Sequence, residues 1–186
     1  MTDEEAIFWR KEATSLGASL ARVIRVDQIL MDPRTRLKCR VPLCPSYGRN
    51  LMCPPFLPSY AEAETMVRKY SYALLLKLEV NMGDGPDRDV AYEGAISLHR
   101  LVNSLEKLAF QKNYRFAAGL IGGTCRLCAR CAAESGSTHC RHPFEARPSM
   151  EAMGIDVVGT LESLGLKKPV FPATATVEWV GLLLLE

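Results

Sequence analysis

The chain has 186 residues, 48% of them hydrophobic and 24% charged, with a formal net charge of +2. This balance excludes a disordered chain and a coiled coil, and the charge alone is too small to indicate a nucleic-acid-binding protein. The length fits a single domain, residues 1–186, and the longest apolar runs are far shorter than the roughly 20 residues that cross a bilayer. The acidic start MTDEEAIFWRKEA lacks the features of a secretion signal, so we expect a soluble, cytoplasmic protein.

The first part of the chain is expected to contain a short helix, a strand and a long loop. Residues 4–16 have a helical pattern, and residues 19–29 alternate apolar and polar residues as a half-buried strand does. Residues 32–58 contain six prolines, three cysteines and five basic residues. This composition disfavours a packed regular element, so we predict a loop wrapped around some other component.

The middle of the chain contains the clearest helix. Ser59 and Glu62 form a capping-box pattern that starts a short helix, and residues 72–80 are expected to form a buried strand. Asp87 or Asp89 is expected to cap a long helix. The apolar positions of this long helix step by four and three residues and are Ala91, Ala95, Leu98, Val102, Leu105 and Ala109.

The last third of the chain again alternates strands and helices. Residues 116–121 are expected to form a buried strand, directly before the second group of cysteines. Pro148 is expected to start a helical stretch that is broken at Gly154 and resumes after Asp156, with Gly165 as its C-terminal cap. Residues 174–186 are expected to form the last strand. The succession predicts an α/β or α+β fold, a single layered domain with a mixed sheet of about four strands and helices packed on it. The cysteine-rich loops are expected at 32–58 and 122–147, and the strand order is not determined.

The seven cysteines fall into two groups. CRVPLCPSYGRNLMCPP holds the first group and CRLCARCAAESGSTHC holds the second. An odd number of cysteines in a chain without a secretion signal argues for a reducing compartment, where clustered thiols usually bind metal or carry redox chemistry. The candidate metal- and cofactor-binding residues are Cys39, Cys44, Cys53, Cys125, Cys128, Cys131 and Cys140.

The second group has the spacing of iron–sulfur proteins. A zinc ion usually takes its ligands as two Cys-x2-Cys pairs. Here Cys125, Cys128 and Cys131 are three consecutive ligand positions, which suit a [4Fe–4S] cluster better than a single ion. Cys140 is the natural fourth ligand, because the GSTH segment before it is flexible enough to fold back.

The first group supplies only three thiols. Cys44 and Cys53 are each followed by proline, which withholds an N–H donor from the sulfurs. A cluster bound by Cys39, Cys44 and Cys53 leaves one iron without a thiolate. That iron is open to a histidine, a carboxylate, a water molecule or a substrate. The preferred interpretation is two [4Fe–4S] clusters, with four ligands at 125–140 and three at 39–53.

Several alternatives remain open. Cys140 may instead serve the first group, because the fourth cysteine of such a run can ligate the other cluster of a pair. An eighth ligand can come from His99, His139, His142 or an acidic residue, and both groups together can hold one larger cofactor. Structural zinc is the main competing interpretation, whereas a dithiol redox site fits the three-cysteine run less well.

Other residues near the cysteines suggest supporting roles. Tyr47 and Asn50 can line an open coordination site or pack the loop, and Gly122 and Gly123 are attributed to close approach of the backbone to a cluster. Nearby positive charge can stabilise an anionic cluster or attract an anionic substrate or an acidic redox partner. Nucleic acid is disfavoured, because no aromatic platform is interleaved with the basic residues. The basic residues are Arg34, Arg36, Lys38, Arg40, Arg49, Arg126, Arg130, Arg141 and Arg147.

The cysteine segments also resemble a known family. CRVPLCPSYGRNLMCPP, GGTCRLCARC and CRHPFEARPSMEAMGIDV, within residues 39–157, are similar to an uncharacterised family of bacterial and archaeal proteins described as predicted metal-binding. The resemblance implies a cytoplasmic prokaryotic protein that binds metal through the matched cysteines. It implies no particular reaction.

These observations lead to one main functional expectation. The chain is expected to be an iron–sulfur protein that transfers electrons or performs redox or Lewis-acid chemistry at an iron without a cysteine ligand. If it is an enzyme, we expect an iron–sulfur-dependent oxidoreductase or lyase, acting with a redox partner protein or a small-molecule substrate. The alternative is a structural zinc-binding module for protein interaction or nucleic acid. The sequence does not determine the catalytic residues or the oligomeric state.

Overall fold

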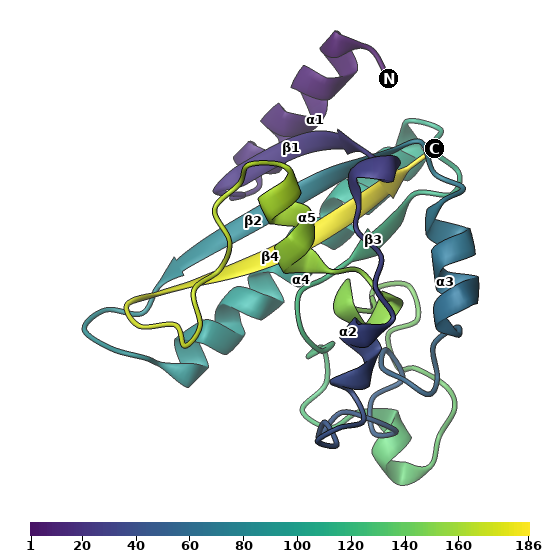
Figure 1. Ribbon diagram of the computed structural model, residues 1–186, viewed down its shortest axis with the longest axis vertical. Helices are drawn as coiled ribbons and strands as arrows, with labels where there is room; N and C mark the ends of the chain where they lie inside the picture. Colours follow the sequence, from purple (N-terminus) through teal and green to yellow (C-terminus); the bar gives the residue numbers. More distant parts are fainter.

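Four strands form a single sheet in the computed structural model, which describes residues 1–186 (Figure 1). The order across the sheet is β1-β2-β4-β3, and every neighbouring pair is antiparallel. The expected layered α+β architecture with four strands is therefore confirmed, although the sheet is antiparallel where a mixed sheet was expected. The strands are β1 (Leu20–Arg25), β2 (Tyr72–Asn81), β3 (Ala118–Leu120) and β4 (Thr176–Leu185).

The long first loop explains the antiparallel pairing. The chain leaves the sheet at Arg25 and returns at Tyr72, and these two residues lie directly opposite each other. The last residue of β1 therefore pairs with the first residue of β2, so the two neighbouring strands run in opposite directions. The first cysteine group lies within this connection.

The two central strands are buried on both faces. In β2, Leu75 packs into a core on one face, whereas Leu74 and Leu76 pack into a core on the other. In β4, Leu182 and Leu183 divide in the same way. A strand covered on both faces reads as a continuous apolar run, which explains why the segments ALLL and GLLLL lack alternation.

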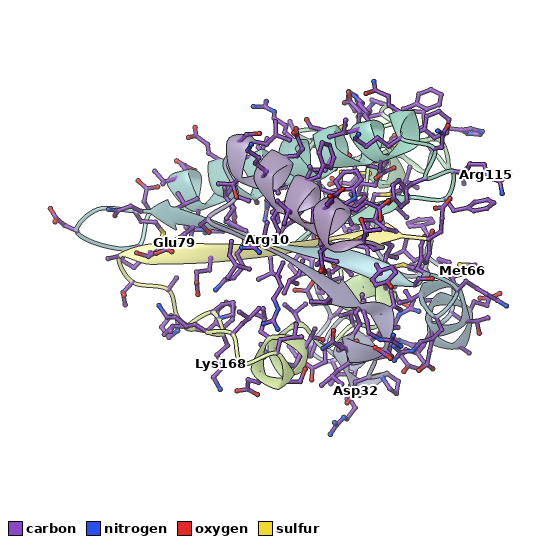
Figure 2. All side chains as sticks on the ribbon, turned by 90° about the horizontal axis from the view of Figure 1, so that it is seen from above. Arg10, Asp32, Met66, Glu79, Arg115 and Lys168 are labelled. Carbon is purple, nitrogen blue, oxygen red and sulfur yellow. The ribbon has the colours of Figure 1, made fainter.

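One face of the sheet is covered by the two longest helices, α1 (Asp3–Ser15) and α4 (Arg88–Gln111), as Figure 2 shows. Asp87 caps α4, because its Oδ1 accepts hydrogen bonds from the backbone N–H groups of Asp89 and Val90 at 2.9 and 3.1 Å. The expected long helix is therefore present.

The opposite face is covered by short helices (Figures 1 and 2). Ser59 and Glu62 form the expected capping box at the start of α3. None of the helices in the structure combines the length and the apolar character needed to cross a bilayer. The short helices are η1 (Val26–Gln28), α2 (Arg34–Leu37), α3 (Tyr60–Val67), η2 (Ala132–Ser135), η3 (Glu151–Met153) and α5 (Val157–Ser163).

The helix expected to begin at Pro148 is not observed. Instead, the Ile121 N–H donates to the Pro148 carbonyl at 3.0 Å, and the Met150 N–H donates to the Ile121 carbonyl at 2.9 Å. This bridge engages the backbone groups that a first helical turn would need, so helical structure is delayed to the single turn η3.

Candidate metal centre

A short segment, residues 149–156, connects the two cysteine loops; we call it the strut. On one side, Ser149 forms a parallel bridge with Ile121, four residues before the first cysteine of the second group. On the other side, Ile155 forms an antiparallel bridge with Met31, at the start of the first loop. Figure 1 shows α2 and both loops gathered at one end of the molecule. The strut therefore fixes both cysteine groups to one support.

The three cysteines of the first group line a common cavity of about 500 Å³. The turns between them are held by the backbone, since the Cys44 N–H donates to the Cys39 carbonyl at 3.1 Å. The Cys53 N–H donates to the Asn50 carbonyl at 2.9 Å. Cys53 is buried, and Cys39 and Cys44 are half-buried. We call this space the first cavity.

The four cysteines of the second group line another cavity, of about 360 Å³, which we call the second cavity. Two of their sulfurs accept backbone hydrogen bonds. The Leu51 N–H donates to Cys131 Sγ at 3.4 Å, and the His142 N–H donates to Cys140 Sγ at 3.3 Å. Such bonds stabilise the charge of a thiolate. Cys140 lies with the second group and does not line the first cavity.

The two groups are locked together although they lie far apart in sequence. The Asn50 side-chain amide donates to the Cys125 carbonyl at 2.9 Å, so Asn50 links the loops. Arg49 Nη2 lies 3.1 Å from Glu134 Oε2 and adds an ion pair between the same two loops. Ser46 and Thr124 line both cavities and form part of the wall between them.

The thiols lie in an environment that disfavours their charged form. Burial, with a smaller contribution from neighbouring cysteines, raises the pKa of Cys53 to about 12. Burial also raises the pKa of Cys39 and of Cys125 above the ordinary value. These thiols therefore keep their protons at neutral pH in the free protein, and a cation that binds to the sulfurs would have to displace these protons.

Most of the basic residues near the cysteines are engaged with protein groups. Lys38, Arg40 and Arg130 have no side-chain ion pair, and Lys38 lines the first cavity. The engaged partners are Asp32 for Arg34, the Pro58 carbonyl for Arg36, Glu134 for Arg49, the Tyr92 ring for Arg126, the Arg130 carbonyl for Arg141 and Glu106 for Arg147.

The histidines lie away from the first cavity. His99 is buried on α4, with Nε2 2.8 Å from the Glu145 carbonyl oxygen. Burial lowers the pKa of His99. His142 lines the second cavity, and His139 lines neither cavity. No histidine therefore stands beside the three-cysteine group.

Glu151 is a cavity residue that the sequence analysis did not single out. It begins the short helix η3 in the strut and lines the first cavity together with the three cysteines. The residue as a whole is exposed, but the protein around its carboxyl raises the pKa of that group by burial. Hydrogen bonds from its own backbone, from Ser149 and from the Gly123 backbone oppose this shift. The available signal was an acidic residue within the otherwise apolar segment MEAMGI.

The two glycines before Cys125 have a structural explanation. A Cβ at Gly122 would lie 2.8 Å from the Val180 carbonyl oxygen of β4, and Gly123 has a φ of +70°. Glycine is therefore required by close approach to the sheet and by a left-handed backbone. The expected approach to a cluster is not needed to explain these residues, although both line the first cavity.

The far walls of the first cavity are largely apolar. They come from the strut, α5 and β4, and include Ile155, Val157 and Trp179. Tyr47 also lines this cavity, whereas Asn50 lines the second. The first cavity therefore combines the three cysteines with a largely apolar wall.

The donor groups do not form a closed site for one metal ion. No three His, Cys, Asp or Glu side chains converge so that they could hold a single ion. The seven cysteines are all free of disulfide bonds and surround two adjoining spaces. The cysteines therefore line the two spaces as a group of three and a group of four.

The comparisons with known proteins give one family. A family model described as "Predicted metal-binding protein (DUF2284)" matches residues 22–185, a region that contains both cysteine groups. The resemblance expected from the cysteine motifs is thereby confirmed. No curated protein and no solved structure matches the chain.

Proposed function

The chain belongs to the DUF2284 family of predicted metal-binding proteins, and from this membership we propose that it is an iron–sulfur protein holding two [4Fe–4S] clusters. The observation that carries the proposal is the division of the seven cysteines between two adjoining cavities, three in one and four in the other. The same division was the preferred interpretation of the cysteine spacing, which left the place of Cys140 open.

The proposed ligands belong to two centres. The four-cysteine centre takes Cys125, Cys128, Cys131 and Cys140, and the three-cysteine centre takes Cys39, Cys44 and Cys53. When bound, the clusters would supply one-electron transfer and, at the three-cysteine centre, an iron without a full set of thiolates that can act as a Lewis acid.

The geometry of the second cavity favours a cluster over zinc. A zinc ion draws four sulfurs to about 2.3 Å from one point, so little space remains between them. Here the four thiols, together with other residues, line a cavity of about 360 Å³, which leaves room for a group larger than one ion. The N–H groups of Leu51 and His142 already point at two of the sulfurs, and hydrogen bonds of this kind tune the reduction of iron–sulfur centres.

The first cavity supports chemistry on a small molecule in addition to electron transfer. Its volume of about 500 Å³ lies within the range of small-molecule sites, and such sites usually have apolar walls like those seen here. An electron carrier without a substrate has no need of such a space. We therefore propose an oxidoreductase or lyase activity at the three-cysteine centre, with electrons supplied or removed by a redox partner protein through the four-cysteine centre. The free thiols suit the reducing cytoplasm.

Metal and sulfide analysis of protein purified without oxygen tests the proposal. We expect about eight iron and eight sulfide per chain and little zinc. Cys128→Ser and Cys44→Ser should each lose about half of the iron, because each substitution removes a ligand from a different centre. Ser46→Ala is the matched control, since Ser46 lines both cavities without a thiol, and it should keep the full iron content.

Two results would overturn the proposal. A colourless protein with zinc and no sulfide would instead indicate a structural zinc module. A single substitution that removes all iron while leaving the fold intact by circular dichroism would indicate one larger cofactor held by both groups.

A further inference from the structure

The three-cysteine centre lacks one protein ligand, and the structure limits which residue can supply it. The three histidines considered from the sequence are excluded by position, because none of them lines the first cavity. His99 is engaged with the Glu145 carbonyl, and His142 lies in the second cavity. The remaining candidates are the acidic residues of the first cavity.

Three acidic side chains line the first cavity, and two of them have structural roles elsewhere in the fold. Asp156 caps α5, since its Oδ1 accepts from the Gly159 N–H at 3.0 Å. Glu178 Oε1 lies 2.5 Å from Lys77 Nζ in a buried ion pair. Glu151 forms no ion pair and caps no helix, and the hydrogen bonds to its carboxyl come from its own backbone, from Ser149 and from the Gly123 backbone, which line the same cavity.

The backbone brings Glu151 to the first cysteine group. Its helix η3 packs against α2, which ends two residues before Cys39. The Asp32 N–H donates to the Gly154 carbonyl at 2.8 Å and fixes the two segments next to each other. Glu151 and Cys39 also line the same cavity. Glu151 is therefore placed by the strut and not by a mobile loop.

We propose that the Glu151 carboxylate is the non-cysteine ligand of the three-cysteine centre. This inference rests on the proposed function and adds the identity of the fourth ligand to it. A carboxylate oxygen is a harder ligand than a thiolate and suits iron–sulfur centres less well. A ligand would consequently be exchanged most readily at Glu151, which lines the cavity with apolar walls. The molecule that enters should have an apolar body and one oxygen, nitrogen or sulfur donor.

Electron paramagnetic resonance of the reduced protein tests the assignment, with iron analysis as a second measurement. Glu151→Gln should change the signal of one cluster and leave the signal of the other unchanged. Glu151→Cys should also change that signal, and it should retain the full iron content because a thiolate replaces the carboxylate. Asp156→Asn is the matched control: it removes another acid from the same cavity, its amide oxygen can still cap α5, and its spectrum should match that of the wild type.

The outcomes separate this inference from the proposed function. If the wild type contains two clusters and both Glu151 variants give its spectrum unchanged, Glu151 is not a ligand and the two-cluster proposal stands. If Asp156→Asn changes the spectrum and the Glu151 variants do not, the ligand is Asp156 and the inference is wrong. If the wild type contains no iron and no sulfide, the proposed function fails, and the inference fails with it.

Discussion

At the scale of single residues, His99 illustrates how burial removes a candidate ligand from consideration. Its side chain is buried on α4, and its Nε2 is engaged with the Glu145 carbonyl. Burial lowers the pKa of His99, with Arg147 acting in the same direction and the bond to Glu145 opposing it. The folded protein therefore holds a neutral imidazole at a pH where the unfolded chain has begun to bind a proton.

This difference predicts a pH dependence of stability. The folded pKa of His99 is lowered, so its contribution is fully present above the ordinary histidine pKa and is lost as pH falls through the folded value. The free energy of unfolding of the wild type should decrease as pH falls from 7 to 5, by no more than about 1.4 kcal/mol per pH unit from this one proton. Urea unfolding at a series of pH values measures the slope.

His99→Gln provides the comparison for this prediction. A glutamine amide can still donate to the Glu145 carbonyl and does not titrate, so the variant should show a shallower slope between pH 7 and pH 5. Equal slopes in the two proteins would show that His99 titrates alike in the folded and unfolded chain.

The site residues divide into those that the sequence can and cannot predict. The cysteines were found because Cys125, Cys128 and Cys131 follow a spacing with a known chemical use. Glu151 was missed because a single acidic residue has no spacing, and only the strut brings it to the first cavity. The contact between Asn50 and Cys125 was likewise out of reach, since these residues are 75 positions apart.

At the scale of elements, the turn that ends η3 in the strut depends on a glycine with a left-handed backbone, Gly154. Gly154 ends η3 with a φ of +91°, and a Cβ there would lie 2.7 Å from Cδ2 of the Tyr60 ring. Side chains rarely adopt this backbone conformation, and the aromatic ring cannot easily move because it belongs to the first turn of α3. The turn therefore requires glycine for two independent reasons.

Gly154→Ala should destabilise the protein. We expect a loss of about 1–3 kcal/mol in the free energy of unfolding, from backbone strain together with the steric contact. The midpoint of urea denaturation measures it. Gly85→Ala is the matched control, because a Cβ at Gly85 meets nothing within 4 Å and the backbone there is not left-handed. Similar midpoints for the two variants would contradict the proposed rigidity of the turn.

The elements themselves differ in how well local sequence determines them. The helices α3 and α4 were predictable because Ser59 and Asp87 are caps that act within a few residues. The helix expected at Pro148 was wrong because a partner distant in sequence, Ile121, engages the same backbone groups. Capping residues in the sequence therefore predict a helix correctly when the hydrogen bonds of its first turn are made by neighbouring residues.

At the scale of the whole molecule, the hydrophobic core and the cysteine loops are built from different residues. The two core clusters lie on the faces of the sheet, and their buried members include none of the seven cysteines. Apolar burial supplies most of the free energy of folding. The sheet and its helices should therefore not depend on a bound metal.

Removal of metal should loosen the loops and preserve the core. After chelation we expect circular dichroism to retain the helix and strand signals, while limited proteolysis cuts within residues 32–58 and 122–147. The reason is that these loops contribute no buried residue to either core cluster, so their local stability should be low once the bound group is lost. Global loss of the circular dichroism signal, or cleavage elsewhere first, would show instead that the metal is required for the fold.

The wall that the two cavities share at Ser46 and Thr124 has a consequence for how charge would be stored. Two clusters on either side of it would repel each other's added electrons, because Coulomb repulsion is weakly screened inside protein. The second electron would then enter at a more negative potential than the first, even if the two sites were otherwise identical. The protein would thus accept reducing equivalents one at a time, in two distinguishable steps.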